Sequence, residues 1–104
     1  MIESIVRGTT PTHNFNLTID TSEIKTARVI YSQGNKVVFK KEHGDCKMEG
    51  KTVSVTLTQE DTFSLSHNEM AQIQIRILTN GGDCPDTPIY SVPVEKCLDD
   101  EVLE

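Results

Sequence analysis

Three stretches of this sequence alternate apolar and polar residues with a period of two. In each stretch the apolar side chains occupy every second position, with polar residues between them. Successive side chains of a β-strand point to opposite faces of a sheet, so each stretch predicts a strand with one buried and one exposed face. The three stretches are Phe15–Ile19, Val53–Leu57 and Ala71–Ile77. No segment of ten or more residues has the apolar spacing of an amphipathic helix, so the chain is predicted to be all-β.

Turn-forming residues divide the rest of the chain into further short strands. Gly34-Asn35 lies between two apolar stretches and predicts a two-residue hairpin turn, because both residues tolerate positive φ. Glu49-Gly50 predicts a second hairpin in the same way. Pro88 and Pro93 flank a last strand near residues 89–95, and proline cannot donate a hydrogen bond to a sheet. We therefore expect this last strand to lie at a sheet edge.

The number of strands indicates the architecture. With a first strand near residues 4–7, the chain has about seven or eight short strands, typical of an immunoglobulin-like antiparallel β-sandwich. A length of 104 residues leaves room for one domain, predicted over residues 1–95 and followed by an acidic tail over residues 96–104. Thr58–Asp61 has the spacing of a helix cap and predicts a single helical turn between the sheets, with Phe63 and Leu65 filling the core.

The first hairpin is apolar on both faces. A two-residue turn at Gly34-Asn35 pairs Tyr31 with Val38 and Ile30 with Phe39. An antiparallel sheet usually leaves one face exposed to water, so one of these faces needs a cover, either the tail or another subunit. The alternatives are a longer loop that shifts the register, or a small exposed patch that is tolerated. The candidate interaction surface on this hairpin comprises Ile30, Val37 and Phe39.

Charge is concentrated at the C-terminus. The net charge is −6, and the ten residues from Glu95 onward contain five acidic residues and one basic residue, a net charge of −4. A second candidate interaction surface therefore comprises Asp99, Asp100 and Glu101. No stripe of Lys and Arg is present to neutralise phosphates, so nucleic acid is not an expected partner. No apolar run of about 18 residues is present, so no membrane span is expected.

The sequence contains no recognisable catalytic or metal-binding motif. Three cysteines are too few, and odd in number, for a disulfide framework, so reduced thiols are expected. His43 and Cys46 form one pair, whereas a zinc site needs four ligands. Strand parity instead places Cys46, opposite Val53, on the inward face with Met48 and Val55. We therefore predict no catalytic residues, no metal, no cofactor and no small-molecule substrate.

Five segments of the sequence carry a family resemblance: Val6–His13 with Phe15, Val53–Thr62, Ile73–Ile77, Val92–Glu95 and Leu98–Glu101. Together they resemble small proteins encoded among tail and baseplate genes in prophages of gut bacteria. The strand order also resembles the immunoglobulin-like N-terminal domain of phage baseplate upper proteins.

The resemblance implies a structural or adaptor role in a phage particle. The implied partners are other phage structural proteins and further copies of the chain, in the bacterial cytoplasm during assembly and in the virion. It implies no catalytic residues. Baseplate upper proteins continue into further domains, whereas this sequence ends in an acidic tail. Two alternatives stay open: a carbohydrate-binding module, although only five residues are aromatic, and an inhibitor or decoy whose acidic tail mimics a charged partner.

Overall fold

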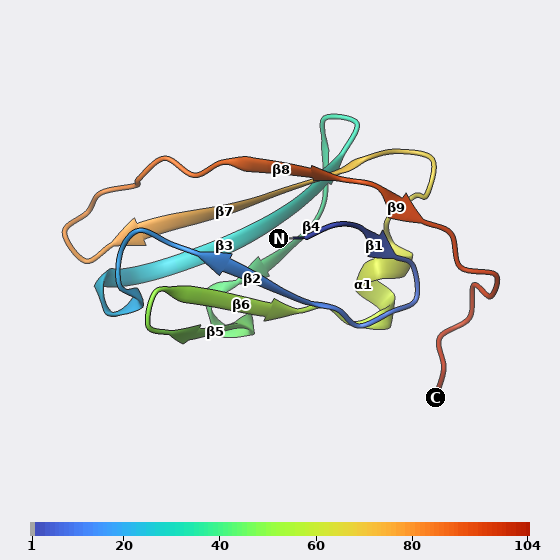
Figure 1. Ribbon diagram of the computed structural model, residues 1–104, viewed down its shortest axis with the longest axis horizontal. Helices are drawn as coiled ribbons and strands as arrows, with labels where there is room; N and C mark the ends of the chain where they lie inside the picture. The colour runs from blue at the N-terminus through green and yellow to red at the C-terminus, as the bar shows by residue number, and fades with distance from the viewer. Residues whose placement is uncertain (1) are drawn as a thin grey trace.

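The structure is a computed structural model that describes residues 2–104; Met1 lies outside the described residues. Two antiparallel sheets pack against each other, and a short parallel pair of strands lies at one end (Figure 1). The larger sheet has the order β4 (Lys36–Glu42), β3 (Ile24–Gln33), β7 (Ala71–Thr79) and β8 (Ile89–Val92). The smaller sheet has the order β2 (Thr12–Asn16), β6 (Thr52–Thr56) and β5 (Cys46–Glu49). The parallel pair joins β1 (Ile5–Val6) to β9 (Val94–Glu95).

This strand order is that of an immunoglobulin-like sandwich. The smaller sheet contains β2, β5 and β6, and the larger sheet contains β3, β4, β7 and β8. Some immunoglobulin-like sandwiches likewise have an added strand on one of their two sheets. The nine strands of residues 2–104 exceed the predicted seven or eight, because Pro93 splits the predicted last strand into β8 and β9. β8 pairs only with β7, so its predicted edge position is confirmed.

The core lies between the inner faces of the two sheets. Along β7, buried side chains alternate with more exposed ones, as the sequence period predicts. Each large side chain that is fully buried contributes about 1.5–3 kcal/mol relative to an exposed one. The largest fully buried side chains are Tyr31, Ile5, Leu57, Leu65, Ile73, Ile75, Val29, Val53, Val55 and Thr62.

The strand predicted over Phe15–Ile19 is displaced toward the N-terminus. β2 begins at Thr12 and ends at Asn16, rather than spanning residues 15–19. Its pairing with β6 stops where Asn16 faces Thr52, and the backbone N–H of Leu17 then donates to the carbonyl of Lys51 at 2.8 Å. Leu17 and Ile19 still pack against the core, so the alternation continues beyond the end of the strand.

The first hairpin has the predicted turn but a different register. Gly34 and Asn35 have φ of 55° and 66°, the left-handed conformation that a two-residue turn requires. A bulge between Tyr31 and Ser32 then shifts the pairing, so Tyr31 faces Phe39 rather than Val38. The rings of Tyr31 and Phe39 stack with centroids 4.5 Å apart. The prediction that Phe39 lies on the outward face was wrong, because the extra residue of the bulge turns Phe39 toward the core.

The second hairpin turns one residue later than predicted. Its turn residues are Gly50 and Lys51, since Glu49 pairs with Thr52, and Gly50 supplies a φ of 59°. The shift places Cys46 opposite Val55 instead of Val53, a displacement of two residues that leaves the parity unchanged. Cys46 is half-buried and packs against the core as expected.

The predicted helical turn is present as α1 (Gln59–Phe63). The Thr58 side chain accepts a hydrogen bond from the Asp61 backbone N–H at 3.1 Å, and the Asp61 carboxylate accepts one from the Thr58 N–H at 2.8 Å. Leu65 is 1% exposed, so its predicted role in the core is confirmed, whereas the same prediction for Phe63 was wrong, because its half-buried ring packs against the Arg7 guanidinium. Two short 3₁₀ helices, η1 (Thr21–Glu23) and η2 (His43–Asp45), precede β3 and β5.

Candidate functional site

The candidate site is the surface of the larger sheet that points away from the core. We call this surface the outer face. Its side chains form rows across the strands, because paired residues of neighbouring antiparallel strands point to the same side. The outer face comprises Thr26, Arg28, Ile30, Ser32, Val37, Lys40, Glu42, Gln72, Gln74, Arg76, Leu78, Ile89 and Ser91.

The outer face keeps two of the three predicted hairpin residues. Ile30 lies between Lys40 on β4 and Gln74 on β7, and its side chain is half-buried by these neighbours. Val37 faces Ser32 and is 48% exposed. Ile89 on β8, which sequence analysis did not single out, is 59% exposed on the same face. The apolar part of this surface therefore consists of Ile30, Val37, Leu78 and Ile89.

Two arginines face each other on adjacent strands of the outer face. Arg28 on β3 pairs in register with Arg76 on β7 and, on its other side, with Glu42 on β4. The Nε of Arg28 donates to Oε1 of Glu42 at 2.8 Å, whereas Arg76 has no ion-pair partner within 4.0 Å among residues 2–104. Like charges directly opposite each other destabilise a sheet, so a carboxylate brought to this row would relieve the repulsion.

A small cavity lies beside the two arginines. Its volume is about 220 Å³, below the roughly 300–1,000 Å³ of pockets that hold drug-sized ligands. The space suits a single side chain better than a whole small molecule. Cys84, from the loop between β7 and β8, contributes to the wall. The lining residues are Thr26, Ala27, Arg28, Glu42, Arg76, Ile77, Leu78 and Cys84.

The acidic tail lies at the other end of the molecule. It follows β9 beside α1, whereas the start of β3 and the end of β7 lie at the opposite end of the long axis (Figure 1). Arg7 donates to the Asp100 carboxylate at 3.2 Å, and the Gln59 side chain makes two hydrogen bonds with the Leu103 backbone, at 2.8 and 3.1 Å. The tail is therefore held in place, and in this conformation it does not cover the hairpin, contrary to one of the two sequence-based expectations.

The predicted surface thus falls into three separate parts. Ile30 and Val37 lie on the outer face, and Phe39 lies on the inner side against Tyr31. The predicted tail residues, which lie near α1, are Asp99, Asp100 and Glu101. The pairing of Arg28 with Arg76 could not be predicted from the sequence, because no turn joins β3 to β7 and nothing local sets their register. The only sequence signal was a single basic residue at an outward position in each of the two strands.

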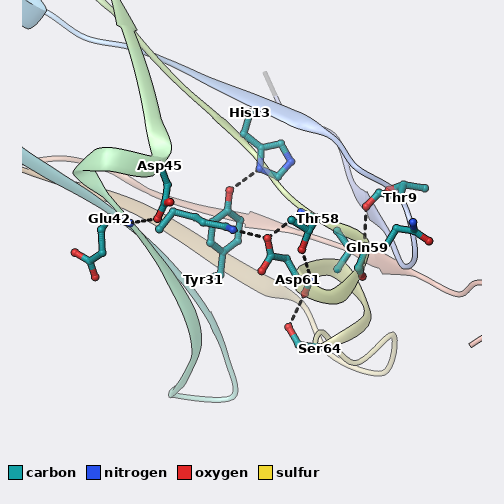
Figure 2. A network of polar contacts seen from close by, with 11 residues as sticks. Thr9, His13, Tyr31, Glu42, Asp45, Thr58, Gln59, Asp61 and Ser64 are labelled. Carbon is teal, nitrogen blue, oxygen red and sulfur yellow. Dashed lines mark hydrogen bonds and ion pairs between the residues drawn. The ribbon is translucent and has the colours of Figure 1, made fainter. Parts of the chain in front are cut away.

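The remaining polar contacts of the interior have a structural role. His13 Nδ1 lies 2.7 Å from the Tyr31 hydroxyl and joins the two sheets (Figure 2). Lys41 on β4 forms an ion pair with Asp61 of α1. Within residues 2–104, no group of three or more His, Cys, Asp or Glu side chains is arranged to hold a metal ion. The helices in this range are too short and too polar to cross a membrane.

Comparison with known proteins gives a structural likeness but no sequence match. No protein-family model matches the sequence, and no curated protein matches it. Among solved structures, the V domain of amphioxus IgVJ-C2 is similar, with 14% sequence identity and a TM-score of 0.37. The match covers 88% of this chain and 98% of that chain. The immunoglobulin-like fold of this protein follows from its own strand order and register.

Proposed function

We propose that this chain is a non-enzymatic structural or adaptor module that acts through protein–protein contacts. The outer face is its docking surface, and the partner segment carries carboxylates. The setting that we propose, from the sequence resemblance, is phage tail or baseplate assembly. The partners would then be other phage structural proteins and further copies of this chain, in the bacterial cytoplasm during assembly and afterwards in the particle.

The observation that carries this proposal is the charge of the outer face. The protein has a net charge of −6, yet this face holds Lys40, Arg28 and Arg76 against one carboxylate, Glu42. Exposed Val37 and Ile89 lie on the same face, so it offers both apolar contact and positive charge. Complementary charge steers association and sets the register of an interface, and arginine is enriched where interfaces bind tightly.

The arrangement favours a protein partner over a carbohydrate. Carbohydrate sites commonly use exposed aromatic rings, and all five aromatic residues of this chain lie within the described residues, away from the outer face. Phe15 and Tyr31 are buried, and Phe39 stacks on Tyr31. The ring centroid of Tyr90 lies 6.2 Å from that of Phe15, and the ring of Phe63 lies under the Arg7 guanidinium. The outer face therefore has no stacking platform.

Two measurements test the proposal. The first maps the binding of short peptides rich in Asp, Glu and Leu by amide chemical shifts of the full chain. We expect shifts confined to β3, β7 and the loop after β7, lost in Arg76→Glu and kept in Lys47→Glu, an exposed β5 residue with the same change of charge. The second is mass spectrometry of purified phage particles from an induced lysogen that encodes the protein. Absence from particles would contradict the phage setting, and shifts elsewhere would contradict the docking surface.

A further inference from the structure

We infer that the partner segment for the arginine row is the acidic tail of a second copy of this chain. This inference rests on the proposed function and names the occupant of the same surface. Residues 96–104 of one copy would bind beside Arg28 and Arg76 of the next, so that copies associate head to tail. Three features of the structure support this: the chemistry of the tail, its ordered conformation, and its place in the molecule.

The chemistry of the tail matches that of the cavity. Asp99, Glu101 and Glu104 are exposed, whereas Asp100 is engaged by Arg7, so three side-chain carboxylates are available to a partner. Leu98 is 97% exposed and Leu103 is 75% exposed, so both apolar side chains are accessible to a partner. The cavity offers two guanidinium groups and the apolar side chain of Leu78, whereas Ala27 and Ile77 contribute to its wall with their side chains buried in the core. A carboxylate seated between the opposed arginines would form charge-assisted hydrogen bonds.

The tail is ordered before it meets a partner. Besides the contacts with Arg7 and Gln59, the Asp99 carboxylate accepts a hydrogen bond from the Glu101 N–H at 3.0 Å. These contacts hold Leu98, Asp99 and Glu101 at the surface instead of leaving them in a mobile chain. A segment already held in one conformation loses less entropy when it binds, so it binds more tightly than a flexible segment of the same composition.

The place of the tail sets the type of assembly. Because the tail and the β3–β7 end lie at opposite ends of the long axis, each copy has one donor end and one acceptor end (Figure 1). When each copy binds the next in the same direction, the interface is heterologous, and repeating it produces a closed ring or an open filament. A module that assembles this way fits a structural role in a particle built from repeated subunits.

The first test is self-association measured by analytical ultracentrifugation of the full chain. We expect the average mass to rise with concentration at low salt and to fall as salt screens the contact. Arg76→Glu should weaken association about tenfold or more, because it removes one attraction and adds a repulsion. Lys47→Glu changes the net charge equally on the other sheet and should leave association unchanged. Self-association that is insensitive to Arg76→Glu would overturn the inference.

A charge exchange tests the partner directly. The double variant Asp99→Lys/Glu101→Lys should be monomeric alone, because its basic tail meets a basic row. Mixed with Arg76→Glu, it should form a mixed complex, because the basic tail of one chain now meets the acidic substitution on the other. Glu3→Lys/Glu49→Lys changes the same number of exposed charges outside the tail and the arginine row, so on its own it should still self-associate like the wild type. Absence of the mixed complex would count against the inference.

A peptide titration separates this inference from the proposed function. A peptide of residues 96–104 with Cys97→Ser should shift the amides of β3 and β7 in the full chain and should slow alkylation of Cys84, which lines the cavity. If this peptide fails to bind while unrelated acidic peptides bind the outer face, the tail inference falls and the proposed function survives. If neither binds, both fall.

Discussion

The ring of His13 on β2 and the hydroxyl of Tyr31 on β3 are joined by a hydrogen bond of 2.7 Å that crosses the core between the two sheets (Figure 2). Both residues are nearly inaccessible to water, at 4% and 0% exposure. The other ring nitrogen of His13, Nε2, has no hydrogen-bond partner among residues 2–104. Burial lowers the pKa of His13 and raises the pKa of Tyr31, so both side chains are neutral in the folded protein.

This pair predicts a loss of stability in mild acid. Below pH 6.5, the unfolded chain binds a proton at His13 that the folded chain resists, so the free energy of unfolding falls as the pH drops. We expect urea unfolding to show a decrease of about 1 kcal/mol for each pH unit over that range. His13→Leu should flatten this dependence, even though it leaves the Tyr31 hydroxyl unpaired. His67→Gln, at an exposed histidine, is the control; if His13→Leu keeps the wild-type slope, the prediction is wrong.

The bulge in β4 predicts unequal costs for two neighbouring substitutions. Phe39→Ala removes a ring stacked on the buried Tyr31 and should cost about 2–4 kcal/mol of unfolding free energy. Val37→Ala removes an exposed side chain of the outer face and should cost less than about 0.5 kcal/mol. Chemical denaturation of both variants measures the difference. Equal, small costs would mean that Phe39 lies on the outer face, as the unbulged register requires.

The ion pair between Lys41 and Asp61 links the edge strand β4 to the cap of α1. Burial favours the protonated form of Asp61, but hydrogen bonds from Lys41 and from the Thr58 N–H outweigh it and hold the pKa below 3.8. The ionised carboxylate therefore contributes stability at neutral pH, and that contribution is lost as the pH falls below 3.8.

Asp61→Asn should cost about 1–3 kcal/mol at pH 7, because it leaves Lys41 without its counterion while preserving the shape of the cap. The difference from wild type should shrink at pH 3, because below pH 3.8 the unfolded wild-type chain binds a proton at Asp61 that the folded chain resists, so the wild type loses stability there. Urea unfolding at the two pH values measures it, with the exposed neighbour Glu60→Gln as control. A difference that does not change with pH would show that the charge of Asp61 contributes nothing.

The turn after β1 predicts a severe effect of a single methyl group. Gly8 has a φ of +81°, and a Cβ at this position would lie 2.8 Å from the ring of Phe63. Gly8→Ala therefore combines backbone strain with a collision, and we expect a loss of about 2 kcal/mol or more. Gly44→Ala is the matched control, because Gly44 has no positive φ and open space around it. Similar thermal midpoints for the two variants would contradict this arrangement.

Several elements could be predicted because their causes are local. The alternation of Ala71–Ile77 sets which side chains face the core, and Gly34-Asn35 sets a two-residue turn. Thr58 and Asp61 cap α1 through hydrogen bonds that span three residues. In each case the interacting groups are close in sequence, so chain geometry alone brings them together.

The candidate site depended on contacts between distant parts of the chain. The opposition of Arg28 and Arg76 follows from the register of β3 against β7, which core packing sets because no tight turn connects these strands. The tail lies beside α1 because Arg7 and Gln59, distant in sequence, hold it there. Sequence analysis identified the tail as a candidate surface but not its location.

The sequence by itself determined the class of fold, the positions of most strands, the hairpin at Gly34-Asn35 and the cap of α1, because period and turn chemistry act over a few residues. Only the tertiary structure decided that a bulge turns Phe39 inward and that two arginines meet on the outer face. The physical reason is that a sheet register is a collective property: every pair in two long strands shifts together, and no single residue specifies it.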